Sequence, residues 1–314
     1  MTESSRKLRC AVVGAGYLGK FHAQKYATIS ECELVAIVDT RDDAKAIADD
    51  LNVPLYNSIE DILNRVDAVS IAAPTTLHFD IARTCLAKGI HALVEKPITV
   101  TVTEADELID VAEKSGSILQ VGHMQRFHPA LLDLGEKISA PNFIESHRLA
   151  PFNPRGTDVD VVLDLMIHDI DIVLNLVNKE VVNISASGAS VLSESIDIAN
   201  ARLDFEGGCV ANITASRVSQ KTERKMRVFQ QAQCFSADLY NHSLDIYYRE
   251  PNKPAEEIAS IGHTAQQYEN NDALMAQIRD FVECINSARR PLVSGEDGRR
   301  ALATATEITT LIQR

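Results

Sequence analysis

The stretch Gly14-Ala15-Gly16-Tyr17-Leu18-Gly19 lies between the apolar run from Leu8 to Val13 and a segment of helical character that starts near Leu18. A strand, a glycine-rich turn and a helix in this order form the phosphate-binding start of a dinucleotide-binding sheet. Gly14 permits the tight turn, Gly16 lets the backbone approach a pyrophosphate, and Gly19 lets the helix pack closely on the strand. The N–H groups at the helix start then face the anion. We therefore predict a dinucleotide site that includes Gly14, Gly16, Tyr17, Leu18 and Gly19.

A carboxylate follows the second apolar run. The run from Leu34 to Val38 ends in Asp39, which lies 20 residues after Gly19. An acidic side chain at this place accepts both ribose hydroxyls of an adenosine and repels a 2′-phosphate. The pattern favours NAD over NADP, with Thr40 and Arg41 as further cofactor neighbours. Arg41 is close enough in sequence to leave NADP open.

The first part of the chain alternates strand-like and helical segments. Helical periodicity covers 79–88 and 102–114, and this alternation is typical of βαβ units in a parallel sheet. We predict a Rossmann-type doubly wound α/β domain over residues 1–122. Its expected strands are 8–13, 34–38, 68–72, 91–94 and 118–122.

A different pattern follows residue 122. After a bridge over 123–140, longer runs of alternating polarity predict a large open antiparallel sheet, and helices are expected over 160–177, 268–289 and 298–313. We predict an α+β domain over residues 123–314. Its expected strands are 143–149, 181–191, 196–205, 209–216, 226–239 and 244–248.

Charge and cysteine content exclude several protein classes. The 314 residues carry a formal charge of −13, which argues against nucleic acid or an anionic membrane as partner. No apolar run is long enough for a membrane span, and the polar start lacks the apolar core of a signal peptide. The six cysteines form no C-x-x-C pair, which predicts free thiols in a reducing cytoplasm and no zinc site.

Two of the expected strands end in residues that can carry chemistry. Pro74 and Thr75 end the third strand and His78 follows, so Thr75 can bond a ribose or a nicotinamide amide; alternatively Thr75 or Thr76 caps a helix. The fourth strand ends in Glu95-Lys96-Pro97. Ligands of such sheets gather at the carboxyl ends of the strands, where the Lys96 ammonium can bond a reacting hydroxyl. We assign Pro74, Thr75, His78, Glu95 and Lys96 to the cofactor site.

A helix of the second domain carries polar residues on one face. Asp164 and His168 are four residues apart, and Asp171 follows on nearly the same face. Asp164 can orient or polarise His168, which can then move a substrate proton. The adjacent pair His168-Asp169 also occurs in metal-dependent phosphohydrolases, but those need further histidines on an all-helical scaffold.

Several basic residues could bind an anionic substrate such as a diphosphate. Arg155 stands out because the loop Phe152 to Thr157 leads into the helix of Asp164. Each of these side chains could equally be a solvated charge. The candidates are Arg126, Arg155, Arg217, Lys225 and Arg227.

Together these features resemble the glucose–fructose oxidoreductase/inositol dehydrogenase (Gfo/Idh/MocA) family. The matching parts are the glycine turn, Pro74-Thr75 with His78, Glu95-Lys96-Pro97, and Asp164 with His168. The resemblance implies NAD(P)-dependent hydride transfer at a sugar or cyclitol carbon. It also implies that Lys96 and His168 contact the substrate, that one of them is the acid/base, and that Asp164 assists. The C-terminal sheet would form part of the substrate pocket and mediate contacts in a homodimer or homotetramer.

The run from Phe152 to Asp171 departs from many members of the family. Asp158-Val159-Asp160 stands where they carry a glycine-rich lead-in, and Met166 replaces a glycine. The run is most similar to members that oxidise UDP-N-acetylglucosamine to its 3-keto form for diamino-sugar lipid A, whose product passes to an aminotransferase. We therefore expect oxidation of a sugar nucleotide, with Lys96, Arg126, Arg155, Asp164, His168 and Arg217 at the substrate. A dehydrogenase of a free sugar or inositol, and a non-catalytic NAD(P) sensor, are the alternatives.

Overall fold

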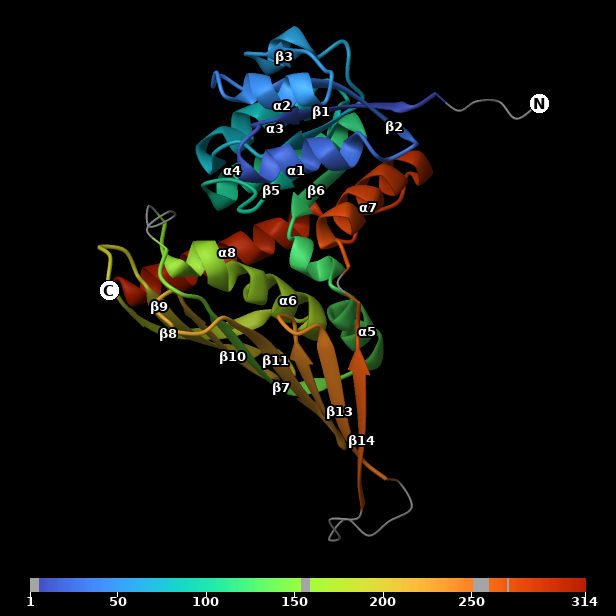
Figure 1. Ribbon diagram of the computed structural model, residues 1–314. Coiled ribbons are helices and arrows are strands. Elements are labelled where there is room, and N and C mark those ends of the chain that lie inside the picture. Colours follow the sequence, from blue (N-terminus) through green and yellow to red (C-terminus); the bar gives the residue numbers. More distant parts are fainter. Residues whose placement is uncertain (1–5, 154–158, 251–259, 270) are drawn as a thin grey trace, which may run out of the picture. The chain divides into compact units, whose positions relative to one another are not determined.

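The computed structural model describes residues 6–153, 159–250, 260–269 and 271–314. They form two compact units (Figure 1). The first consists of Met1–Met124 with Asp272–Arg299, and the second of Gln125–Asn271 with Arg300–Arg314. Each unit has its own sheet and its own hydrophobic core.

The first unit is built on a six-stranded parallel sheet in the order β3-β2-β1-β4-β5-β6. Its central strands are nearly continuous apolar runs, as expected where both faces of a sheet are covered. The strand order reverses between β1 and β4, which is where such sheets bind ligands. The strands are β1 Leu8–Val13, β2 Cys32–Val38, β3 Leu55–Tyr56, β4 Ala68–Ile71, β5 His91–Glu95 and β6 Leu119–Gly122.

Helices cover this sheet. Apolar residues of α1, α2 and α7 pack in one cluster with β1 and β2, while α3 and α4 contact each other. Since βα crossovers are right-handed, α3 and α4 lie on the opposite face. The helix α4 begins with a capping box of Thr101 and Glu104 and ends at Gly116 with φ +68°. The helices are α1 Tyr17–Tyr26, α2 Ala44–Asp50, α3 His78–Leu86, α4 Val102–Ser115 and α7 Ala273–Ser287, with short 3₁₀ turns at Ile59–Asp61 and Thr75–Leu77.

The division into units differs from the predicted one near the end of the chain, where the whole segment Asp272–Arg299 belongs to the first unit. The first boundary falls after Met124, close to the expected residue 122, but α7 belongs to the first unit and not to a domain 123–314. The physical reason is the apolar face of α7, on which Leu274, Ile278 and Phe281 are buried against the core around β1 and α1. Sequence periodicity shows that a helix has an apolar face, but not which core that face covers.

The second unit is built on an eight-stranded sheet in the order β14-β13-β12-β11-β7-β10-β9-β8. All neighbouring strands are antiparallel except β7 and β10, which run parallel. The fold is therefore α/β followed by α+β, as predicted. The strands are β7 Pro141–Leu149, β8 Val181–Ala189, β9 Ile198–Phe205, β10 Val210–Ser216, β11 Glu223–Gln230, β12 Gln233–Asp238, β13 Ser243–Arg249 and β14 Ile261–Gln267.

One face of this sheet carries the helices (Figure 1). Buried residues of α5 (Pro129–Lys137), α6 (Ile167–Val177) and the end of α8 (Gly295–Ile312) share a core with the inward side chains of the strands. Two further turns belong to the described part, a 3₁₀ turn at Met124–Phe127 and a π-turn at Val162–Met166 that leads directly into α6.

Sequence patterning missed four elements. The run 226–239 is two strands, because the chain reverses at Ala232 with φ +62° although no typical turn residue marks the place. The short strand β3 and the exposed edge strand β14 lacked a strong pattern. The helix α5 has an amphipathic sequence that was overlooked, with Ala130, Leu131 and Leu134 on its buried face. The predicted bridge 123–140 thus contains a helix whose start is capped by His128, which is not a usual capping residue.

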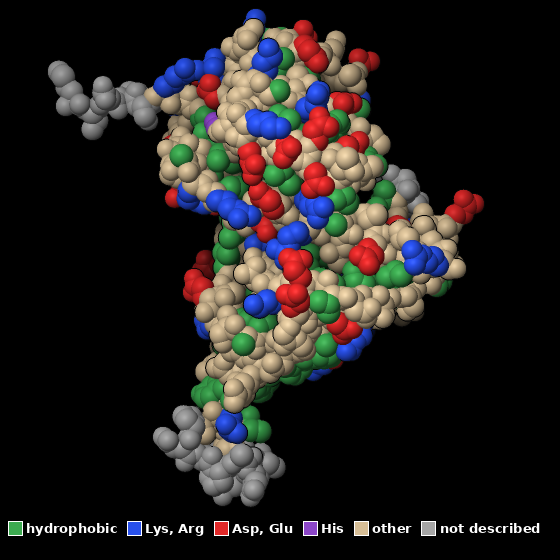
Figure 2. All heavy atoms as spheres, turned by 180° about the vertical axis from the view of Figure 1, so that it is seen from behind, with side chains coloured by type: hydrophobic (Ala, Val, Ile, Leu, Met, Phe, Trp, Pro, Cys, Tyr) green, Lys and Arg blue, Asp and Glu red, His purple; other side chains and the backbone are tan. Residues whose placement is uncertain are grey.

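The charges of the surface are mixed. Figure 2 shows Lys and Arg side chains interspersed with Asp and Glu on the face in view, without one large basic patch. Among the described residues, no helix is long and apolar enough to cross a membrane.

Candidate functional site

The glycine turn has the geometry that its sequence predicts. Gly14 has φ +87°, and a Cβ at this position would lie 2.6 Å from the Ala73 nitrogen. A Cβ on Gly19 would lie 1.8 Å from the Gly14 oxygen, whereas a Cβ on Gly16 would meet nothing within 4 Å. Gly14 and Gly19 are therefore required by the fold, and Gly16 leaves open space at the start of α1. No side chain in the described part of the chain caps α1, so the N–H groups of its first turn can bind an anion.

Asp39 lies beside this turn at the carboxyl end of β2. Its carboxylate accepts the Ala15 N–H at 2.6 Å and the Arg41 N–H at 2.9 Å, and the Arg41 guanidinium pairs with it at 3.1 Å. Burial alone would raise the pKa of Asp39, but the bonds from Arg41 and Ala15 lower it below its usual value. The group is therefore ionised near neutral pH and suited to accept ribose hydroxyls. The pairing also holds Arg41 at the same edge of the site.

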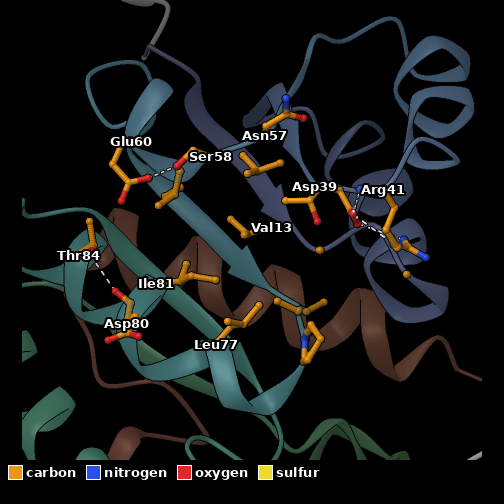
Figure 3. Close-up of a pocket in the computed structure, with 18 residues that line it drawn as sticks. Val13, Asp39, Arg41, Asn57, Ser58, Glu60, Leu77, Asp80, Ile81 and Thr84 are labelled. Carbon is orange, nitrogen blue, oxygen red and sulfur yellow. Dashed lines mark hydrogen bonds and ion pairs between the residues drawn. The ribbon is translucent and has the colours of Figure 1, made fainter.

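A cavity of about 610 Å³ opens next to the turn, with an apolar floor that includes Val13, Leu77 and Ile81 (Figure 3). This volume lies within the range of small-molecule sites. The predicted residues Gly14, Gly16, Asp39, Thr40, Arg41 and Pro74 line it. Sequence reasoning missed the lining residues Asn57, Ser58, Glu60, Asp80 and Thr84. The first three follow the short strand β3, so recognition of that strand could have found them by the strand-end rule.

At the end of β4, Pro74 lines the cavity while His78 points into the protein. The two nitrogens of the buried His78 ring lie 2.9 Å from the Pro97 oxygen and 2.8 Å from the Ala73 oxygen. His78 thus connects the segments that follow β4 and β5. Thr75 begins a 3₁₀ turn, but neither that turn nor α3 has a side-chain cap, so the alternative of Thr75 or Thr76 as a cap was wrong. Contacts of Thr75 and His78 with the cofactor stay a prediction.

At the end of β5, Glu95 is buried and Lys96 is half-buried. One Glu95 oxygen lies 3.1 Å from His22 Nε2 and 3.5 Å from Gln277 Nε2. Gly122 makes room for this carboxyl, since a Cβ there would lie 2.5 Å from it. Glu95 thus joins α1, β5 and α7 inside the first unit, while Lys96 begins a cis peptide bond to Pro97. The cofactor contact assigned to Glu95 remains a prediction.

The second unit carries the other polar candidates. Asp164 lies in the π-turn and His168 in the first turn of α6, both half-buried. Single π-turns within helices often mark functional sites. The neighbouring Asp169 is buried against Arg148 at 2.5 Å and Ser146 at 2.8 Å, and so fixes α6 on β7. Asp171, predicted on nearly the same face as His168, is buried beside Arg126.

Most of the predicted anion-binding side chains have acidic partners within the second unit. Arg126 bonds Asp171 at 3.2 Å and the Asn175 oxygen at 2.6 Å. Arg217 bonds Asp197 at 2.8 Å, and both are buried. Lys225 pairs with the half-buried Asp238, and Arg227 pairs with Glu145 at the surface. Arg155 lies outside the described residues. Substrate binding by these groups stays a prediction, and Arg126 and Arg217 have internal partners of their own.

Among the described residues, no group of three or more His, Cys, Asp or Glu side chains is arranged to hold a metal ion.

Known proteins match both units. The family model described as oxidoreductase family, NAD-binding Rossmann fold, matches residues 8–123, and the GFO/IDH/MocA C-terminal domain matches residues 142–233. The UDP-N-acetylglucosamine 3-dehydrogenase of Acidithiobacillus ferrooxidans is 39% identical over 98% of this chain and 97% of its own. Its crystal structure superposes with a TM-score of 0.91 over 98% of both chains.

More distant relatives share the same architecture. The myo-inositol 2-dehydrogenase of Thermotoga maritima is 25% identical over 94% of this chain and 93% of its own. A scyllo-inositol dehydrogenase from Lactobacillus casei with bound NAD(H) and scyllo-inositol is 19% identical, with a TM-score of 0.81 over 98% of this chain and 97% of that one, and shows the fold alone. The chain therefore belongs to the Gfo/Idh/MocA oxidoreductase family and is an NAD(P)-dependent dehydrogenase.

Proposed function

We propose that this protein oxidises a secondary hydroxyl of a sugar nucleotide, UDP-N-acetylglucosamine at carbon 3, with NAD⁺ as the hydride acceptor. The observation that carries the proposal is the 39% identity to a UDP-N-acetylglucosamine 3-dehydrogenase over 98% of the chain. The presence of Lys96, Asp164 and His168 supports turnover rather than cofactor sensing alone. The product would be the 3-keto sugar nucleotide.

Cofactor binding rests on the first unit. The open start of α1 would hold the pyrophosphate, and Asp39 would accept the hydroxyls of the adenosine ribose. Glu60 and Asp80 also line the cavity, so three carboxylates would oppose a 2′-phosphate. NAD is therefore the proposed cofactor. When bound, it supplies the hydride acceptor for the substrate C–H bond.

Proton removal would fall to Lys96 and His168. As the C–H hydrogen leaves as hydride, the hydroxyl proton must go to a base, and the ketone forms when both have left. Lys96 lies at the end of β5 and His168 at the start of α6, and the base role of either needs its neutral form. Asp164 would assist His168. Arg155 would bind the diphosphate of the substrate, since a guanidinium matches phosphate oxygens in two places.

The surroundings of the reaction belong to the same proposal. The six cysteines are all free thiols, which suits a reducing cytoplasm. An aminotransferase would consume the 3-keto product in the synthesis of diamino-sugar lipid A. The eight-stranded sheet would provide the contacts of a homodimer or homotetramer.

The test is a substrate panel with purified protein. With NAD⁺ and UDP-N-acetylglucosamine, we expect NADH to appear at 340 nm, in larger amount when an aminotransferase and its amino donor remove the ketone. Free N-acetylglucosamine and myo-inositol test the free-sugar alternative, and NADP⁺ tests cofactor choice. A Lys96→Ala, His168→Ala double variant should bind NAD⁺ but lose turnover; retention of wild-type turnover overturns the assignment. Tight NAD⁺ binding with no product from any sugar would favour the sensor alternative.

A further inference from the structure

Asp160 caps the segment that carries Asp164. One oxygen of its carboxylate accepts the N–H groups of Val162 and Leu163, each at 3.0 Å. These are donors that the start of a helix leaves without an intrahelical partner. The Asp160 backbone carbonyl accepts the Asp164 N–H, also at 3.0 Å. One residue therefore holds both the first turn and the backbone of Asp164.

The second oxygen of the same carboxylate reaches a distant part of the chain. It accepts a hydrogen bond from the Thr309 hydroxyl of α8 at 3.2 Å. The start of the π-turn is thus tied to the C-terminal helix, within the second unit. A side chain that only capped the helix start would need no hydrogen bond from the Thr309 hydroxyl.

The residues on either side of Asp160 are fixed as well. The Val159 carbonyl accepts a bond from Arg217 at 2.7 Å, and the Val161 N–H bonds the Ile196 carbonyl at 2.9 Å. Arg217 is 4% exposed and its partner Asp197 is fully buried. Asp197 in turn accepts three backbone N–H groups of residues 191–193. The chain entering the π-turn therefore has little freedom to shift.

Both ends of the π-turn are also held by packing. Val162 and Met166 are fully buried in the core of the second unit, while Asp164 between them is half-buried. A π-turn includes one more residue per hydrogen-bonded ring than an α-turn, so the direction of Asp164 depends on where the turn begins. Asp160 sets that beginning.

We propose that Asp160 is a positioning residue, which fixes the start of the π-turn and so directs Asp164 for the reaction at His168. The inference rests on the proposed function, because it takes Asp164 and His168 as the groups that handle the substrate proton. In this proposal Asp160 itself touches neither substrate nor cofactor. Its effect is on geometry, and displacements of about 1 Å at a catalytic group can cost on the order of 10²-fold in rate.

The experiment compares Asp160→Ala with Asp160→Asn in the full-length protein. Asparagine keeps an oxygen that can accept the Val162 and Leu163 N–H groups, and alanine does not. We expect Asp160→Ala to lower kcat on the order of 10²-fold, with KM for NAD⁺ changed by less than about twofold. Asp160→Asn should restore most of kcat. Thr309→Val, which removes only the second contact, should give a smaller loss.

The matched control is Thr101→Ala, which removes the cap of α4 in the first unit. It should lower the melting temperature comparably but leave kcat unchanged. Wild-type kcat in Asp160→Ala, or equal losses in the alanine and asparagine variants, would overturn the proposal. If Asp160→Ala does not fold, Thr309→Val decides, and an unchanged kcat there overturns it.

Hydrogen exchange separates this inference from the proposed function. Deuterium uptake over residues 161–168 should rise in Asp160→Ala, stay low in Asp160→Asn and be unaffected by Thr101→Ala. If the wild-type protein oxidises no sugar nucleotide, the proposed function is wrong, and the exchange pattern alone decides whether Asp160 holds the turn. Unchanged deuterium uptake in Asp160→Ala would contradict the role of Asp160 in holding the π-turn, whatever the activity of the protein.

Discussion

The helix α1 of the first unit and the π-turn before α6 in the second begin in opposite ways. The start of α1 follows Gly16, has no side-chain cap and faces open space. The start of the π-turn is closed by Asp160 and held through Thr309, Arg217 and Ile196. Free N–H groups make a helix start a place for an anion, whereas capped ones fix the side chains that follow. In the proposed function, the start of α1 would bind the cofactor and the start of the π-turn would direct the proton-handling group.

The largest expected effect is on the free energy of unfolding, through the buried ion pair of Arg217 and Asp197 beside the start of the π-turn. Asp197→Ala leaves the buried Arg217 without its carboxylate and frees the loop that it holds. Removal of one partner of a buried ion pair costs about 3–5 kcal/mol. Urea unfolding should show this loss, while the exposed pair of Arg227 and Glu145 provides a control: Glu145→Ala should change stability by less than about 1 kcal/mol. Equal losses of stability in Asp197→Ala and Glu145→Ala would contradict the distinction between the buried and the exposed ion pair.

A third helix start, that of α5, should respond to pH. His128 caps it by accepting the Ala130 N–H on Nδ1 at 3.2 Å, and its Nε2 lies 2.9 Å from His242. Burial, with the nearby His242 and Arg224, lowers the pKa of His128 to about 4 from 6.5. The folded state resists protonation of His128, so protonation favours the unfolded state. The contribution of His128 to the free energy of unfolding is therefore complete above pH 6.5 and decreases as the pH falls toward 4, by about 2 kcal/mol at pH 5. Urea unfolding at several pH values measures it.

His128→Asn is the control for that measurement. Asparagine also caps helices but does not titrate, so the variant should lose less stability than the wild type between pH 6.5 and 5. A wild-type pH dependence that persists unchanged in His128→Asn would show that other groups cause it.

Closing the open start of α1 should weaken cofactor binding without loss of stability. A Cβ in Gly16→Ala meets no protein atom within 4 Å, yet it would occupy the approach to the pyrophosphate. We expect a Kd for NAD⁺ raised by about tenfold or more, equivalent to about 1.4 kcal/mol, with an unchanged melting temperature. Gly135→Ala in α5 is the matched control, since its Cβ also meets nothing and it should bind NAD⁺ normally. A wild-type Kd for NAD⁺ in Gly16→Ala would show that the cofactor does not bind at the start of α1.

The smallest expected effect is on the choice between NAD⁺ and NADP⁺. Asp39→Ser removes the charge that opposes a 2′-phosphate and releases Arg41 to pair with it. The ratio of kcat/KM for NADP⁺ to that for NAD⁺ should rise by several-fold or more, about 1 kcal/mol. Asp43→Ser, which removes the more distant partner of Arg41, should change the ratio less. An unchanged ratio in Asp39→Ser would assign the discrimination to other residues.

The sequence allowed prediction of the uncapped start of α1 but not of the capped start of the π-turn before α6. Gly14 and Gly19 act through local backbone geometry, and Asp39, whose bond to the Ala15 N–H spans 24 residues, stands at the spacing that the dinucleotide motif sets. Arg126 and Arg217 act through partners 45 and 20 residues away, so the sequence could not distinguish a buried ion pair from a ligand-binding side chain. Asp160 could be recognised only as a departure from the family pattern. Its role depends on Thr309, 149 residues later in the chain.

The membership of α7 in the first unit has a consequence for synthesis on the ribosome. The nucleotide-binding unit is discontinuous, because residues 125–271 separate its two segments. At about 5–20 residues per second, roughly 7–30 s pass between the emergence of the first segment and that of α7. Until then the surface that later buries Leu274, Ile278 and Phe281 is uncovered. The nascent chain therefore presents a transient apolar surface of the kind that chaperones recognise, and a fragment that ends before residue 272 would keep it permanently.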